Sequence, residues 1–188
     1  VITKNTNYNN KVNERITAFS GLKSLSTRLV NALQTTDATT ETIGNAKTFN
    51  RKMQGKKASS SQTPTDPNTP APNTISTSQQ SYDQLIQHLA GLTSILEAET
   101  SYTPNETDLQ VATLQTKIAD LTAKNTAVAT AYASISNSRI ARNETLYSSS
   151  TGLVETANEV KKYIKSVFGA SSPQFAQVKG IQFKIIKN

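Results

Sequence analysis

Few residues in this chain could perform acid–base, nucleophilic or metal chemistry, and their spacing fits no known catalytic arrangement. His88 is the single histidine, and its helical neighbours three and four positions away are Gln84, Leu85, Gly91 and Leu92. None of these supplies a carboxylate or a second imidazole, so a metal ion or a general base at His88 would need partners from another element. We therefore expect His88 to be an ordinary surface or boundary residue.

Carboxylates occur in close pairs, which matters because helical bundles hold di-iron centres through Glu and Glu-x-x-His motifs. The chain has no cysteine, and its seven glycines form no phosphate-binding loop. The sequence thus predicts no catalytic, cofactor-binding or metal-binding residue, and no enzyme. None of the carboxylate pairs has a histidine three residues further on, and the pairs are Glu97 with Glu99, Glu106 with Asp108, and Glu155 with Glu159.

Basic residues gather in two segments that both have helical periodicity. A weak similarity between residues 28–53 and 139–164 would place the two segments in equivalent positions, unless it is the chance alignment of two amphipathic hairpins. The formal net charge is +7, which is compatible with nucleic acid, an anionic membrane or an acidic partner, or simply with a soluble protein of basic pI. The candidate basic patch comprises Lys47, Arg51, Lys52, Lys56, Lys57, Lys161, Lys162 and Lys165.

One long helix is expected to position the rest of the chain. Residues at alternating steps of three and four run from Val111 to Leu146 without Gly or Pro, and Thr103-Pro104-Asn105-Glu106 has the form of a capping box. We predict a helix from Thr103 to Tyr147, which must lie against partners because one apolar seam cannot be buried alone.

Three polar residues interrupt the apolar seam of this long helix. Asn125 is a candidate register residue, since a buried asparagine can determine helix alignment at a cost in stability. Arg139 and Arg142 are expected in solvent, where the seam leaves the core.

Shorter helices are expected before and after the long one. After a loose arm over residues 1–10, helical spacing covers residues 11–33 in spite of Gly21, whose cost of about 1 kcal/mol the flanking leucines can offset. A helix with Ile43 to Met53 on one face follows and stops at Gly55.

The chain between and beyond these elements has its own signals. A helix should start near Ser78 and end near Ser101. After the long helix, an apolar stripe from Leu153 to Val167 predicts one more helix, closed by Gly169 in the left-handed conformation. Ser172 and Pro173 are suited to cap one short further turn.

Two stretches lack helical periodicity. Residues 58–76 are rich in Ser, Thr and Pro and contain almost no large apolar side chain, which predicts a flexible linker. After Gly180, three apolar residues alternate with polar ones, which predicts a short extended tail. The candidate tail-contact residues either dock on their own bundle or add as a strand to a neighbouring subunit, and they are Ile181, Phe183 and Ile185.

Two segments of the chain resemble uncharacterised bacterial helical proteins. One includes Arg142-Asn143, Tyr147, Gly152-Leu153-Val154, Ala157, Val160 to Ser166 and Phe168-Gly169, and the other includes Leu25 to Leu33 and Arg51 to Gly55. The resemblance covers most of the chain outside residues 58–76 and carries no catalytic signature. It implies a bacterial origin and an all-α fold, and no established activity.

These patterns predict an all-α protein: an elongated antiparallel bundle of four or five helices around one long helix, with a short extended C-terminal tail. Residues 1–57 are expected as an N-terminal helical hairpin that packs with residues 77–179 into one domain, with the linker at 58–76 and the tail at 180–188. No apolar run is long enough to cross a bilayer.

The predicted function is that of a non-enzymatic structural or protein-interaction bundle. It would be a subunit of an exported or cell-surface bacterial assembly, with a protein partner or self-association and no cofactor. The alternative is non-specific binding of nucleic acid or an anionic surface through the basic helices. The chain begins with Val1, which is compatible with a removed export signal or with a cloning boundary, and an exported or surface location is favoured over the cytoplasm.

Overall fold

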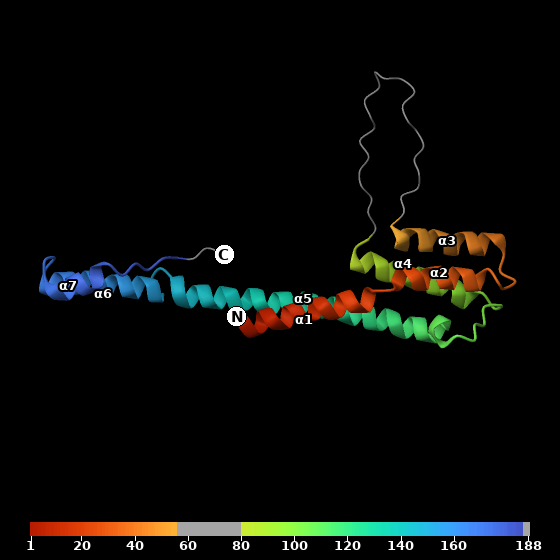
Figure 1. Cartoon of the computed structure of the whole chain (residues 1–188), viewed down its shortest axis with the longest axis horizontal. Coiled ribbons are helices and arrows are strands. Elements are labelled where there is room, and N and C mark those ends of the chain that lie inside the picture. The colour runs from red at the N-terminus through yellow and green to blue at the C-terminus, as the bar shows by residue number, and fades with distance from the viewer. Residues whose placement is uncertain (56–79, 186–188) are drawn as a thin grey trace, which may run out of the picture. The chain divides into compact units, whose positions relative to one another are not determined.

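The computed structural model describes residues 1–55 and 80–185, and all regular structure within these ranges is helical (Figure 1). No strand occurs in the described ranges, so the predicted all-α class is confirmed. The described part has seven α-helices and one short 3-10 helix where four or five helices were predicted. They are α1 (Ile2–Phe19), α2 (Leu22–Leu33), α3 (Thr40–Gln54), α4 (Tyr82–Ala98), η1 (Thr107–Leu109), α5 (Val111–Tyr147), α6 (Leu153–Phe168) and α7 (Pro173–Lys179).

The helices belong to two units. Residues 10–129 form one, called the core unit here, and residues 1–9 together with 130–188 form the other, called the terminal unit. Both boundaries fall inside helices, so α1 and α5 each contribute residues to both units. The linker predicted at residues 58–76 lies outside the described residues.

The core unit has a continuous apolar interior built from α2, α3 and α4, which lie side by side (Figure 1). The 3-and-4 spacing of Leu89, Leu92 and Leu96 puts these residues on one face of α4, and each is at most 1% exposed. Leu114 and Leu121, one heptad apart at the start of α5, are also fully buried in this cluster. The interior additionally includes Phe19, Leu22, Leu29, Val30, Leu33, Ala46, Met53, Tyr102 and Leu109.

Hydrogen bonds from buried and partly buried side chains join α2 to α3 inside the core unit. Ser26 of α2 is fully buried, and its hydroxyl donates to Asn50 Oδ1 of α3 at 2.9 Å. Gln54 at the end of α3 donates from Nε2 to the carbonyl of Lys23 at 2.7 Å. These bonds join α2 to α3 without leaving a buried donor unsatisfied, which would cost about 1–3 kcal/mol.

The N-terminal part of the chain differs from the prediction in two ways. The predicted loose arm is helical from Ile2, and Tyr8 packs its ring 5.9 Å from that of Tyr132 within the terminal unit. The predicted single helix over residues 11–33 is broken at Ser20 and Gly21, where Gly21 has φ +80°, a conformation that favours glycine. The break turns α2 into the leucine-rich core and leaves Ile16 of α1 52% exposed.

The long helix begins later than its capping box predicted. Thr103 and Pro104 are not helical, and η1 precedes the true start at Val111. Burial of Tyr102 explains this difference, because its hydroxyl donates to the carbonyl of Leu109 at 3.0 Å and holds the intervening residues in a non-helical turn. The predicted end at Tyr147 is confirmed.

The other predicted helix boundaries agree with the structure except those of α4, which begins at Tyr82 and ends at Ala98 rather than near Ser78 and near Ser101. Thr39 and Ser81 cap α3 and α4 with their hydroxyl oxygens, and α3 ends at Gly55 with φ +73°. The predicted short turn is α7, which Ser172 caps by accepting from the backbone N–H of Phe175 at 3.1 Å. Gly169 follows α6 with φ +89° and ψ 157°, a positive-φ conformation that is extended rather than the predicted left-handed helical one.

Candidate interaction surface on α6 and α7

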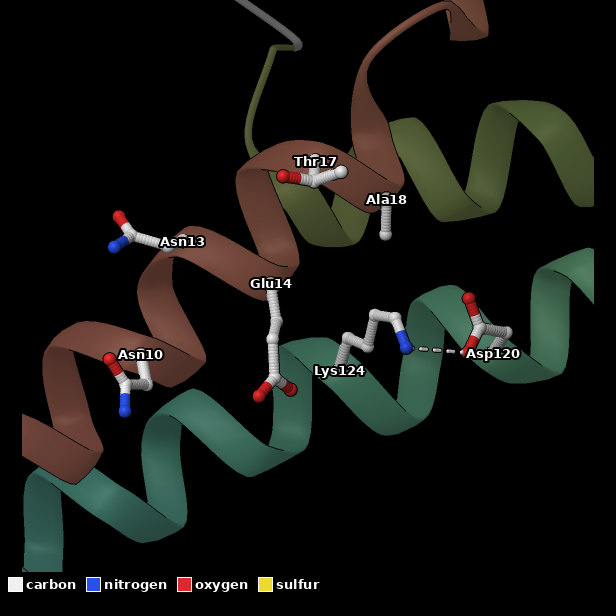
Figure 2. A pocket seen from close by; sticks show the side chains of 7 residues that line it. All are labelled: Asn10, Asn13, Glu14, Thr17, Ala18, Asp120 and Lys124. Carbon is white, nitrogen blue, oxygen red and sulfur yellow. Dashed lines mark ion pairs between the residues drawn. The ribbon is translucent and has the colours of Figure 1, made fainter.

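One hollow of the core unit is a groove between α1 and α5. It has a volume of about 580 Å³ and is lined by Asn10, Asn13, Glu14, Thr17, Ala18, Asp120 and Lys124. Figure 2 shows Glu14 extending from α1 toward α5, while Asn13 points away.

Both carboxylates of this groove are paired with lysines. Lys11 contacts Glu14 and Lys124 contacts Asp120, each at 2.9 Å between nitrogen and oxygen. The hydrogen bond and charge of Asp120 raise the pKa of Lys124. No group of three or more possible metal ligands occurs in residues 1–55 or 80–185. The groove therefore offers hydrogen-bonding groups to a polar molecule.

His88 does not lie at the surface, in contrast to the expectation from the sequence. Its exposure is 7%, and its ring centroid lies 6.3 Å from that of Phe49 on α3. The reason is that α4 packs closely on α3, which covers the face of α4 that carries His88. His88 is a packing residue of the core unit.

Asn125 connects three helices within the core unit. Its Nδ2 donates to Asp83 Oδ1 on α4 at 2.7 Å, and its Oδ1 accepts from Arg15 Nη1 on α1 at 3.0 Å. The guanidinium of Arg15 also lies 3.9 Å from the ring centroid of Tyr82. These directional contacts are what a register residue would require, and the register role of Asn125 stays a prediction.

The long helix exposes its polar C-terminal half. Arg139 is exposed, and Arg142 is half-buried and donates to the side-chain oxygen of Asn143. Tyr132, which the 3-and-4 spacing placed in the apolar seam, is 57% exposed. In the terminal unit, the buried apolar side chains within residues 130–185 are Ala131 and Ile135 alone.

The predicted basic patch is divided between the two units. Lys47, Arg51 and Lys52 are exposed on α3 of the core unit, whereas Lys56 and Lys57 lie outside the described residues. The three others belong to α6 in the terminal unit, and they are Lys161, Lys162 and Lys165. A common positive end formed by both groups stays a prediction.

The lysines of α6 line a hollow of about 350 Å³ against α7. Lys161 donates from Nζ to the carbonyls of Lys179 at 3.2 Å and Ile181 at 2.6 Å, and Lys165 lies 5.9 Å from the Phe175 ring centroid. Within residues 80–185, no lysine of α6 or α7 has a carboxylate partner within ion-pair distance. The hollow is lined by Glu155, Asn158, Lys161, Lys162, Lys165, Phe175 and Lys179.

The apolar stripe of α6, which the sequence predicted to pack, remains largely uncovered. Among the sixteen residues of α6 none is buried. Leu153 is 60% exposed, Val160 51%, Tyr163 70%, Val167 54% and Phe168 52%. The cause is that α7 lies along the lysine-bearing flank and no other helix of the terminal unit covers the stripe.

The predicted tail-contact residues are exposed and form no strand in the described part. Ile181 is 49% exposed, Phe183 39% and Ile185 58%. The start of the tail is held to α6 through the carbonyl of Ile181, which accepts from Lys161. Whether the side chains dock on another subunit stays a prediction.

Sequence periodicity could not identify this surface, although it identified α6 itself. A 3.6-residue repeat of apolar side chains indicates that a helix has an apolar face. It does not indicate whether another part of the chain covers that face. Three residues outside the predicted basic patch lie at this candidate surface: Phe175 and Lys179 line the hollow, and Tyr163 is 70% exposed.

Comparison with known proteins adds no relative. No family model, no curated protein and no solved structure matches this chain. Among the helices of the described residues, none combines the length and the apolar character required to span a bilayer. Because no known protein matches the chain, the functional proposal is based on the side chains of α6 and α7.

Proposed function

We propose that this chain is a non-enzymatic structural or interaction protein in which the terminal unit supplies the contact surface. The core unit covers most of its large apolar side chains and has a contiguous interior of fully buried leucines. The terminal unit is the opposite case. Of the thirteen large apolar side chains that are exposed in the described residues, all but Ile16 belong to it.

This unequal distribution of apolar side chains is the observation that carries the proposal. Burial of a Val, Leu or Phe side chain stabilises by about 1.5–3 kcal/mol, and contiguous exposed apolar surface is characteristic of interaction sites. A partner that covered α6 would supply the burial that the terminal unit lacks. In its finer form, the proposal makes the chain one subunit of an exported or cell-surface assembly.

The test is the solution mass of the full chain by light scattering, at two protein concentrations and two salt concentrations. The proposal expects a discrete oligomer, or binding to a surface, that is weakened by Val160→Asp combined with Val167→Asp. Both valines are about half exposed, so the substitution removes apolar surface without disturbing a packed interior.

A matched control exists in the core unit. Ile16 is 52% exposed, almost the same as Val160, so Ile16→Asp makes the same chemical change outside the terminal unit. It should leave the solution mass and any binding unchanged. A strictly monomeric chain that binds neither vesicles nor nucleic acid would refute the proposal.

A second candidate function is favoured by the lysines of α6 and α7. These lysines line one hollow and have no carboxylate partner in the described residues, which suits a polyanion such as nucleic acid. Such binding would weaken steeply as salt rises and would not respond to Val160→Ser, which removes apolar surface without adding a negative charge. Absence of nucleic-acid binding at low salt would exclude it.

A further inference from the structure

We propose that α6, together with α7 and residues 181–185, docks on an anionic lipid surface. The apolar side of α6 would enter the boundary between headgroups and acyl chains, and the neighbouring lysines would contact lipid phosphates. This inference rests on the proposed function and names the partner of the same surface.

The first support is the separation of residue types around α6. At about 100° per residue, the exposed apolar side chains of α6 span an arc of about 140°, and the charged residues occupy the opposite side. A broad apolar arc with a lysine-containing polar side is the pattern of helices that lie in a membrane interface. The apolar arc consists of Leu153, Val160, Tyr163, Val167 and Phe168, and the charged side of Glu155, Glu159, Lys161, Lys162 and Lys165.

The second support is the position of α7. Phe175 and Lys179 of α7 line the hollow with Lys161 and Lys165, so α7 lies along the lysine flank of α6. The bonds from Lys161 to the carbonyls of Lys179 and Ile181 fix this arrangement. The apolar arc is thereby left open to a surface.

The third support is charge complementarity. Residues 153–185 contain five lysines and two glutamates, and none of these lysines is ion-paired in the described residues. An anionic leaflet attracts such lysines, and their long aliphatic stems let the ammonium groups reach phosphates from beside a buried apolar face. A nucleic acid would engage the lysines alone and an apolar protein groove the arc alone. An anionic lipid surface engages both.

The experiment is co-sedimentation of the full chain with vesicles of phosphatidylcholine, with and without phosphatidylserine, at low and high salt. We expect binding to the phosphatidylserine vesicles that weakens as salt rises, and much less binding to pure phosphatidylcholine. Lys162→Ser with Lys165→Ser should weaken binding by about fivefold per lysine at low salt. Val160→Asp with Val167→Asp should weaken it by about tenfold or more.

Matched controls come from the core unit. Lys47→Ser with Lys52→Ser removes the same charge from exposed positions of α3, and Ile16→Asp repeats the apolar change at equal exposure. Both should bind vesicles as the unsubstituted chain does. If these control variants lost as much vesicle binding as the α6 variants, the assignment of the lipid contact to α6 would be wrong.

The remaining outcomes separate this inference from the function on which it rests. Equal binding to neutral and anionic vesicles would overturn the lipid proposal, since the lysines would then make no contribution. Salt-sensitive binding that Val160→Asp leaves unchanged would also overturn it, since the apolar arc would then make no contribution. Self-association that Val160→Asp disrupts, without vesicle binding, would overturn the lipid proposal and leave the proposed function standing. Neither self-association nor binding to vesicles or nucleic acid would overturn both.

Discussion

Two glycines in neighbouring helices of the core unit should respond differently to the same substitution. Gly44 lies in α3 and Gly91 in α4, both inside helices. A Cβ at Gly44 would meet nothing within 4 Å, whereas a Cβ at Gly91 would lie 2.5 Å from Cε1 and from Cζ of Phe49. The absence of a side chain at Gly91 is therefore what lets α3 and α4 pack closely.

The magnitudes follow from two opposing effects. Replacing Gly by Ala inside a helix favours folding by about 1 kcal/mol at either position. At Gly91 the phenyl ring must leave its place, and overpacking of this kind costs about 1–3 kcal/mol. Gly44→Ala should therefore raise the free energy of unfolding by up to about 1 kcal/mol. The free energy of unfolding of the Gly91→Ala variant should be about 1–3 kcal/mol lower than that of the Gly44→Ala variant.

The assay is urea unfolding followed by far-ultraviolet circular dichroism. In a Phe49→Leu background the ring is absent, and Gly91→Ala should become as favourable as Gly44→Ala. Equal stabilisation by both glycine substitutions in the unsubstituted chain would refute the reasoning, because it would mean that the ring contact imposes no cost.

Three further changes test other parts of the core unit. Leu92→Ala should lower the free energy of unfolding by about 2–5 kcal/mol, measured by urea unfolding, because Leu92 is fully buried. Gly21→Ala should cost about 1–2 kcal/mol from the positive φ alone, since nothing lies within 4 Å of the added Cβ, and an unchanged midpoint would contradict this. Burial raises the pKa of Tyr102 to about 12 from 10.0, so its contribution to stability is complete below pH 10 and is lost as pH rises toward 12, because the unfolded phenol ionises first. Tyr102→Phe should therefore lose less stability than the unsubstituted chain over that interval, and parallel losses would show that Tyr102 is not responsible.

The helices were predictable where local signals were sufficient. Ser172 before Pro173 and Gly55 after α3 were identified because capping hydroxyls and positive-φ glycines act within one or two turns. The end of α5 at Tyr147 was identified from the Ser-rich turn that follows it in the sequence. The late start of α5 was not, since it depends on the buried hydroxyl of Tyr102 and its bond to Leu109. A capping-box pattern cannot reveal that competing contact.

The sequence by itself determined the all-α class and the amphipathic character of each helix, because a 3.6-residue repeat is a property of neighbouring residues along the chain. Only the tertiary structure decided which apolar faces are covered. It buries the leucines of α2 and α4 together and places His88 inside, and it leaves the apolar arc of α6 in water. Burial depends on which helices meet, and that is a property of contacts between residues far apart in the chain.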